Sequence, residues 1–145
     1  AQNTHPYPLT NNIFKMHKLH TTANVGIAHN GVISDYNPTK DDGDVNDTQN
    51  FIKTYLYYLS SFDKTFYKRK HHQDTIADIT SSRFAILDSS DNLYLIGGFV
   101  LEDNLSFSNR NYKPQTYIYK SHSAYNSYYN NYWDNYYKKL EKDEI

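Results

Sequence analysis

The residues with the clearest chemical potential lie in the segment 28–33, which reads Ala-His-Asn-Gly-Val-Ile. Asn-Gly between two short apolar runs is typical of a tight turn, because both residues tolerate positive φ. Such a turn can direct the side-chain amide of Asn30 and the backbone N–H of Gly31 toward one point. Two donors aimed at a developing oxyanion are what acyl-transfer catalysis requires. The other interpretation of the same residues is a turn that only ends an apolar strand.

Two further motifs flank this segment. His5-Pro6 lies upstream, and Asp47-Thr48 lies downstream at the expected start of a helix. Asn46 or Asp47 can cap that helix, because a side-chain oxygen can accept a hydrogen bond from a backbone N–H of the first turn. The chain therefore presents a His-Pro motif, the Ala-His-Asn-Gly-Val-Ile motif and an Asp-Thr motif in that order.

This order of motifs resembles class II glutamine amidotransferase domains of the N-terminal-nucleophile hydrolase superfamily. The segments 82–88 and 93–98 are similar to the strand pair that follows the helix in that family. Ser108-Asn109 resembles a late feature of the shorter, phage-type members. The resemblance runs from about His5 to Asn109, and it implies an α+β fold of the N-terminal-nucleophile type, an αββα layered sandwich that lacks its first strands.

The resemblance also implies roles for individual residues. Asn30 and Gly31 match the pair that forms the oxyanion hole. Asp47 matches the carboxylate that holds the α-amino group of the glutamine substrate, although a helix-capping role for Asp47 explains it equally well.

Three further residues support these motifs without a direct chemical role. His29 and Thr48 are the neighbours of the oxyanion pair and of the substrate carboxylate, respectively. His5 belongs to a motif that is mainly architectural in the family, and a hydrogen-bonded loop histidine is the interpretation we prefer for it.

The chain departs from the family at the nucleophile. It contains no cysteine and begins with Ala1. In the family, a cysteine at the mature N-terminus hydrolyses glutamine, and its own α-amine serves as the base. The family's Arg-x-x-Thr motif, which grips the substrate carboxylate and precedes the His-Pro motif, is also absent from this sequence. We therefore expect the chain as written to be inactive on its own.

Three explanations stay open. The chain is a portion of a longer, cysteine-bearing parent that hydrolyses glutamine to glutamate and ammonia, or it is one half of a split protein whose partner chain supplies the nucleophile. Alternatively, it is a non-catalytic structural or interaction protein, for example of a virus, on the same scaffold. The first two explanations make glutamine the small-molecule substrate, and none of the three requires a cofactor.

The elements that position these residues can be predicted from periodicity. Apolar residues at i, i+1, i+4, i+5 and i+8 over 51–59 predict a helix packed on a sheet. The apolar segments 25–28 and 84–87 predict buried strands, and the turn residues 88–92 predict a hairpin with a strand over 93–100. Further short strands are expected at 105–107 and 116–119, and 63–78 as a loop or an exposed helix. Together these elements predict an α+β layered domain.

Composition separates a globular part from a tail. We expect the domain to span 1–120, followed by a Tyr/Asn-rich and charged appendage over 121–145, because 8 of the 16 tyrosines lie between 117 and 137. No apolar run approaches the roughly 20 residues of a membrane span, and the first ten residues lack a secretory signal. We therefore expect a cytoplasmic protein without a membrane partner.

Two other kinds of site are conceivable for these residues. The seven histidines show no spacing typical of zinc ligands, so no metal site is expected. The basic run 68–72, flanked by aromatic residues, and the Tyr-rich tail could bind single-stranded nucleic acid. A formal net charge of −1 gives no general attraction to nucleic acid, so that function is an alternative rather than our expectation.

Overall fold

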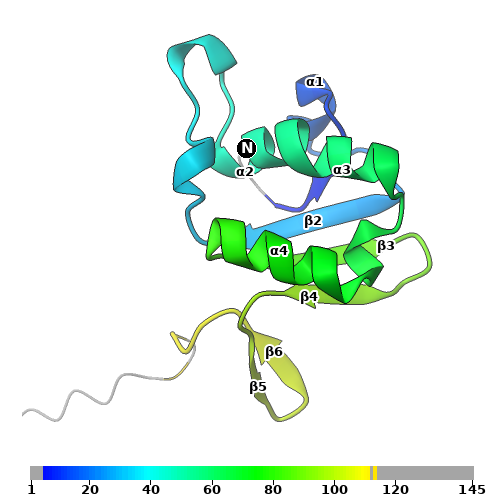
Figure 1. Cartoon of the computed structure of the whole chain (residues 1–145), viewed down its shortest axis with the longest axis vertical. Helices are drawn as coiled ribbons and strands as arrows, with labels where there is room; N and C mark the ends of the chain where they lie inside the picture. Colours follow the sequence, from blue (N-terminus) through cyan, green and yellow to red (C-terminus); the bar gives the residue numbers. More distant parts are fainter. Residues whose placement is uncertain (1–4, 112, 114–145) are drawn as a thin grey trace, which may run out of the picture. The chain divides into compact units, whose positions relative to one another are not determined.

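A four-stranded antiparallel sheet forms the centre of the fold, in the order β1-β2-β3-β4 (Figure 1). The computed structural model describes residues 5–111 and 113, and the chain divides into two units, 1–110 and 111–145. The sheet belongs to the first unit, and β2 lies antiparallel to both β1 and β3 within it. The strands are β1 (Tyr7–Pro8), β2 (Val25–Asn30), β3 (Arg83–Asp88) and β4 (Leu93–Ile96).

The helix predicted from the apolar stripe is present and begins where a cap was expected. Asn46 is its N-cap, and a reciprocal capping box joins Asn46 to Gln49. The helical segment has three consecutive parts, of which the middle one is π-helical, a feature that the stripe does not predict. These parts are α2 (Asp47–Phe51), η3 (Ile52–Leu56) and α3 (Tyr57–Phe62).

A second helical segment occupies the region that we predicted as a loop or an exposed helix. It consists of the 3-10 turn η4 (Phe66–Lys68) and the helix α4 (Lys70–Thr80). The helix is largely exposed, but Phe66, Tyr67 and Ile76 are buried in the core. Periodicity does not predict this contribution to the core, because polar and basic residues outnumber the few apolar ones in the segment.

The helices cover one face of the sheet (Figure 1). Ile27 pairs with Ile86 in the β2–β3 register, and both are fully buried beneath the helices. Alternate residues lie on the opposite face, where Ala28 pairs with Ala85. Beside the β3–β4 turn, that opposite face exposes two apolar side chains: Leu87 is 49% and Leu93 is 59% exposed.

The strand predicted over 93–100 is interrupted. β4 ends at Ile96, and the chain then turns at Gly97, whose φ is +90°. A Cβ at Gly97 would lie 2.3 Å from the carbonyl oxygen of Ser82, so only glycine fits this close approach. The next strands form a separate two-stranded sheet, β5 (Val100–Glu102) with β6 (Leu105–Phe107).

The strand predicted at 105–107 is therefore confirmed, whereas the strand at 116–119 and the tail over 121–145 lie outside the described residues. Among the described residues, no helix combines the length and the apolar character needed to traverse a bilayer. The remaining short helical elements are α1 (Ile13–Met16), η1 (Ser34–Tyr36) and η2 (Lys40–Asp42).

Candidate functional site

The candidate site lies where β2 ends. His29 and Asn30 are the last two residues of β2, and Gly31 follows with a φ of +149°. The Asn-Gly pair ends the strand, but the apolar residues after it form no second strand: Val32 is 66% exposed and Ile33 leads into η1. β2 pairs instead with strands that are distant in the sequence, β1 and β3.

The first turn of α2 brings the Asp-Thr motif to this end of β2. One carboxylate oxygen of Asp47 accepts a hydrogen bond from the backbone N–H of Ile33 at 2.7 Å, and the other accepts from the N–H of Thr48 at 2.7 Å. The N-cap is Asn46, whose side chain accepts from the N–H of Gln49. Asp47 therefore connects α2 to the segment directly after Gly31, in a position that the helix dipole favours.

A chain of hydrogen bonds joins His29, Thr48 and Asp47. The Nδ1 atom of His29 lies 2.8 Å from the hydroxyl oxygen of Thr48, and that hydroxyl lies 3.3 Å from the Asp47 carboxylate. Because the carboxylate can only accept, the Thr48 hydroxyl donates to it and accepts from Nδ1–H of His29. This network assigns the Nε2 atom of His29 as the unprotonated ring nitrogen. Nε2 is buried and has no hydrogen-bond partner among the described residues.

The surroundings of His29 favour the neutral imidazole. Its ring stacks on Phe84 with centroids 4.7 Å apart, and the ring of His5 lies 6.4 Å away. Burial lowers the pKa of His29, an effect that the nearby Asp47 carboxylate opposes and that His5 reinforces. Burial likewise lowers the pKa of His5, against the opposing effects of Asp47 and of a hydrogen bond with the backbone of Ile27. A hydrogen-bonded histidine near the start of β1 is the role that we expected for His5.

Gly31 is exposed, but two side chains lie close to its Cβ position, and it borders a cavity. A Cβ at Gly31 would lie 2.3 Å from Oγ of Ser82 and 3.3 Å from Nε2 of His29. A cavity of about 310 Å³ opens beside Gly31, and Ser34, Asp35 and Thr80 are among the residues that line it. Ser82 is a site neighbour that the motifs did not predict, although its place directly before a buried strand could have indicated a position near the strand end.

Asn30 lies apart from the His29–Thr48–Asp47 chain. Consecutive side chains of a strand alternate between faces, so the Asn30 amide leaves β2 on the face opposite to His29. Its Nδ2 atom donates a hydrogen bond to Oγ of Ser108 at 2.6 Å. The structure thus brings Gly31, His29 and the Asp-Thr motif together, whereas the Asn30 side chain borders the same strand end from the other face.

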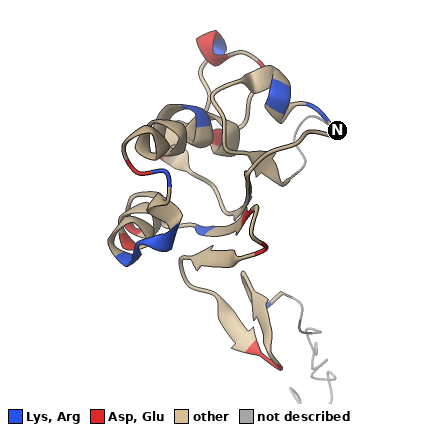
Figure 2. Cartoon of the chain, turned by 90° about the vertical axis from the view of Figure 1, so that its right-hand side faces the viewer, with Lys and Arg blue, Asp and Glu red and all other residues tan. Residues whose placement is uncertain are grey.

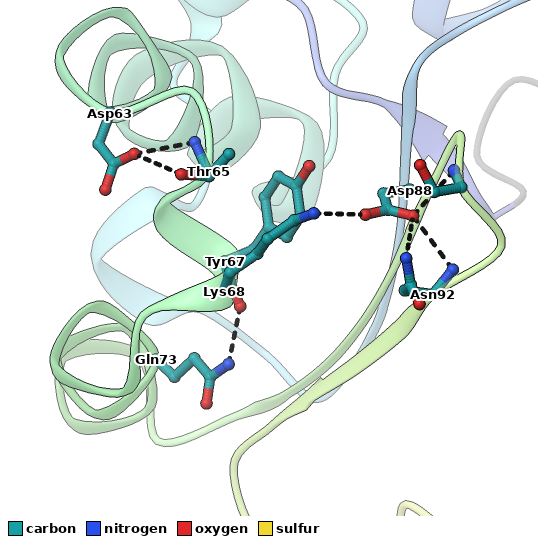
Figure 3. Close-up of polar contacts among 8 residues, drawn as sticks. Asp63, Thr65, Tyr67, Lys68, Gln73, Asp88 and Asn92 are labelled. Carbon is teal, nitrogen blue, oxygen red and sulfur yellow. Dashed lines mark hydrogen bonds and ion pairs between the residues drawn. The ribbon is translucent and has the colours of Figure 1, made fainter.

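The basic run is engaged in ion pairs within the chain. Lys68 pairs with Asp88 at 3.0 Å (Figure 3), and the two following cations pair with Asp63 and Asp74, respectively. Figure 2 shows that acidic residues (red) lie among the basic ones (blue) on the helices and strands. A groove of uncompensated positive charge, as nucleic acid requires, is not formed by this run.

Lys68 and Asp88 form a closed polar cluster with Asn92 (Figure 3). One Asp88 oxygen accepts hydrogen bonds from the N–H of Ser90 and from the N–H and side chain of Asn92, at 3.0–3.3 Å. Burial alone would raise the pKa of Asp88, but the hydrogen bonds from Asn92, Lys68 and Ser90 together lower it to about 2. Lys68 also lies 5.7 Å from the centre of the Tyr94 ring.

Within residues 5–111 and 113, no group of three or more His, Asp or Glu side chains is placed to hold a metal ion. The fold and the site thus define a mixed α+β domain with a histidine–threonine–aspartate chain at the end of a central strand. No protein-family model matches the chain, and comparison with curated proteins and with solved structures finds no match.

Proposed function

We propose that the chain is the C-terminal portion of a class II glutamine amidotransferase domain, which hydrolyses glutamine to glutamate and ammonia in a cysteine-bearing parent. The observation that carries the proposal is the hydrogen bond from the N–H of Ile33 to Asp47. It joins the Asp-Thr motif to the His-Asn-Gly motif, which the family resemblance requires to act on one substrate molecule.

The oxyanion donors of this proposal are the Asn30 amide and the N–H of Gly31. An amide nitrogen carries two hydrogens, so Nδ2 of Asn30 can donate one to Ser108 and keep the other for an oxyanion. Cysteine attack on the side-chain amide of glutamine gives a tetrahedral intermediate, and its collapse forms a thioester and releases ammonia. Water then releases glutamate from the thioester and regenerates the thiol.

Asp47 supplies the negative charge for the α-ammonium group of glutamine in this proposal. Its two oxygens accept two backbone N–H groups and the Thr48 hydroxyl, and an ionised carboxylate has about four acceptor positions, so one remains for a ligand. His29 and Thr48 hold the Asp47 carboxylate in position through their hydrogen bonds. Their role is positional, because neither contacts the proposed reacting carbonyl.

The proposed fold is the αββα sandwich of the N-terminal-nucleophile type. Helices cover one face of the present sheet, and the other face carries Ala28, Ala85 and the exposed Leu87 and Leu93. Large exposed apolar side chains on a sheet face favour a further packed layer. We assign that layer, together with the cysteine, to an upstream segment of the parent or to a partner chain.

Two experiments test the proposal in sequence. The first determines the intact mass and the N-terminal sequence of the native gene product and of any chain that co-purifies with it. The proposal requires a cysteine at a mature N-terminus in that material. A native product that starts at Ala1 and has no partner chain would contradict it, and would favour the non-catalytic scaffold protein.

The second experiment measures glutaminase kinetics of the cysteine-bearing protein. Asn30→Ala should lower kcat by roughly 10²–10³, the usual loss when one oxyanion donor is removed. Asn11→Ala, which changes an exposed asparagine between β1 and α1, is the matched control and should leave kcat unchanged. An undiminished rate in Asn30→Ala would refute the assignment of Asn30.

The same assay distinguishes the proposed role of Asp47 in substrate binding from that of Asn30 in catalysis. Asp47→Asn should raise KM for glutamine by about 10- to 100-fold, since hydrogen bonds to charged groups contribute about 1.5–3 kcal/mol. The effect on kcat should be smaller, because Asp47 contacts the ammonium group and not the reacting carbonyl. A loss confined to kcat would show that Asp47 does not bind the substrate.

A further inference from the structure

A second cavity lies at the other end of β2. It has a volume of about 470 Å³ and is lined by Val25, the first residue of β2, together with residues of α1 and α3 and of the loops beside them. Small-molecule sites commonly have volumes of about 300–1,000 Å³. Asn30 ends the same strand and does not line this cavity. The cavity is therefore separate from the candidate site described above.

The charged groups of this cavity are all positive. Lys15 of α1 and Lys64, which follows α3, both line it, and no aspartate or glutamate does. Neither lysine forms an ion pair within the described part of the chain, whereas Lys53 and Lys68 each pair with an aspartate. Two cations on separate elements therefore border one cavity without a carboxylate to neutralise them.

Uncharged donors complete the lining. Thr22 and Asn24 line the cavity, and neither side chain has a hydrogen-bond partner among the described residues. Ser60 also lines the cavity, but its single hydroxyl proton is donated to the Tyr57 carbonyl and is not available to a ligand. Lysine is a common phosphate ligand that acts as a point charge, and hydroxyl and amide donors suit the remaining phosphate oxygens.

We propose that this cavity, the Lys15–Lys64 cavity, binds the phosphate group of a small soluble phosphate monoester. A phosphate monoester is close to a dianion at neutral pH, so two unpaired lysines match its charge, and its three terminal oxygens match the surrounding donors. A neutral sugar lacks this charge match. The proposal rests on the cavity alone and does not depend on the proposed glutaminase function.

The test uses the full 145-residue chain, labelled with ¹⁵N and titrated with glucose 6-phosphate while NMR amide shifts are recorded. Saturable shifts confined to residues of the Lys15–Lys64 cavity are expected. The same titration with glucose should give none. Lys15→Ala combined with Lys64→Ala should weaken binding at least about tenfold, since each hydrogen bond to a charged group contributes about 1.5–3 kcal/mol.

The matched control is Lys40→Ala, which removes an exposed lysine that neither lines the cavity nor forms an ion pair in the described residues. It should leave the affinity unchanged. Equal weakening by Lys40→Ala and by the double variant would overturn the proposal, because it would show general charge attraction. Failure of glucose 6-phosphate to shift the cavity residues would also overturn it, as would binding only to vesicles that contain phosphatidic acid.

Discussion

Two polar clusters occupy opposite ends of the β2–β3 pair, and they differ in how completely their hydrogen-bonding groups are satisfied. Asp88 lies opposite Val25 at one end, and His29 lies opposite Phe84 near the other. Both oxygens of Asp88 have partners, with Lys68 on one and Asn92 among the donors to the other. His29 has a partner at Nδ1 only, and its buried Nε2 has none in the described residues.

This difference distinguishes a fully satisfied cluster from one with a buried unpartnered atom, a property that His29 shares with His17 and Asn50 in the described part of the chain. A buried polar atom without a partner costs about 1–3 kcal/mol, so its presence requires an explanation such as a ligand or a catalytic role. The Asp88 cluster leaves no such atom and needs only a structural explanation. In the His29 cluster, the buried Nε2 lies 3.3 Å from where a Cβ of Gly31 would be, and Gly31 itself lines the cavity. The two clusters should therefore respond differently to substitution and to pH.

Among the substitutions near the two clusters, Gly31→Ala should have the largest effect on stability. The new Cβ would meet Oγ of Ser82 at 2.3 Å, in a backbone conformation that alanine rarely adopts. We expect a loss of about 2–4 kcal/mol in the free energy of unfolding, from backbone strain and crowding together. Urea unfolding followed by circular dichroism measures it.

Gly43→Ala is the matched control for this substitution. Gly43 has a φ of +77°, but no atom lies within 4 Å of its Cβ position, so only the backbone cost applies. With a ψ of −157°, Gly43 lies in a region that is essentially restricted to glycine, so the substitution should cost about 1–3 kcal/mol. Adding Ser82→Ala to Gly31→Ala should recover part of the loss. Equal costs at the two glycines would show that the end of β2 is not crowded by Ser82.

A smaller effect is expected from Thr48→Val. This nearly isosteric change keeps the buried volume but leaves Nδ1 of His29 without its partner, so the free energy of unfolding should fall by about 1–3 kcal/mol. Thr75→Val, at an exposed position of α4, should change stability by no more than about 0.5 kcal/mol. Similar values for both variants would show that the His29–Thr48 bond does not stabilise the site.

The protonation of His29 should make stability depend on pH. Burial lowers the pKa of His29 in the folded chain, so below the ordinary histidine pKa the unfolded chain binds more protons than the folded one. The stability contributed by neutral His29 is therefore present above that pKa and is lost as the pH falls. NMR titration of the His29 ring should give a midpoint below 6.5, the ordinary histidine pKa. A higher midpoint would contradict the burial argument.

The smallest effect is expected at the Asp88 cluster, in Lys68→Met. Since the folded-state pKa of Asp88 is about 2, its ionised form contributes stability above the unfolded pKa, and this contribution disappears as the pH falls toward 2. Removing Lys68 should raise the pKa of Asp88 toward its unfolded value, so a small part of the stability is lost at neutral pH and the remaining acid-dependent loss begins at higher pH. Acid unfolding curves measure the shift. Lys70→Met, which breaks the exposed pair with Asp74, should leave the curve in place.

Local patterns are sufficient to predict several elements. The capping residue Asn46 and the apolar stripe from Phe51 to Leu59 predict the helical segment because each contact involves neighbours in sequence. The turn at 88–92 likewise predicts the β3–β4 hairpin. The π-helical part of the helix and the burial of Phe66 are not predictable in this way, since neither has a distinctive local pattern.

The candidate site likewise combines features that the local sequence predicts with features that it does not. The residue types at Asn30, Gly31 and Asp47 by themselves indicate chemistry, because amide, N–H and carboxylate groups have fixed donor and acceptor roles. The partners of these groups are not predictable from residue type: Ile33 for Asp47, Ser82 beside Gly31 and Ser108 for Asn30. Each partner is set by how the chain packs around β2.

Residue types and their periodic spacing are thus enough to establish the capped helix, the β3–β4 hairpin and a set of groups able to bind an oxyanion and an ammonium ion. Tertiary packing alone decides that β2 lies between β1 and β3, that Gly97 ends β4, and that His29 bonds to Thr48. The physical reason is the separation along the sequence over which each kind of interaction acts. Propensity and capping act within a few residues, whereas strand order and buried hydrogen bonds depend on which distant surfaces exclude water together.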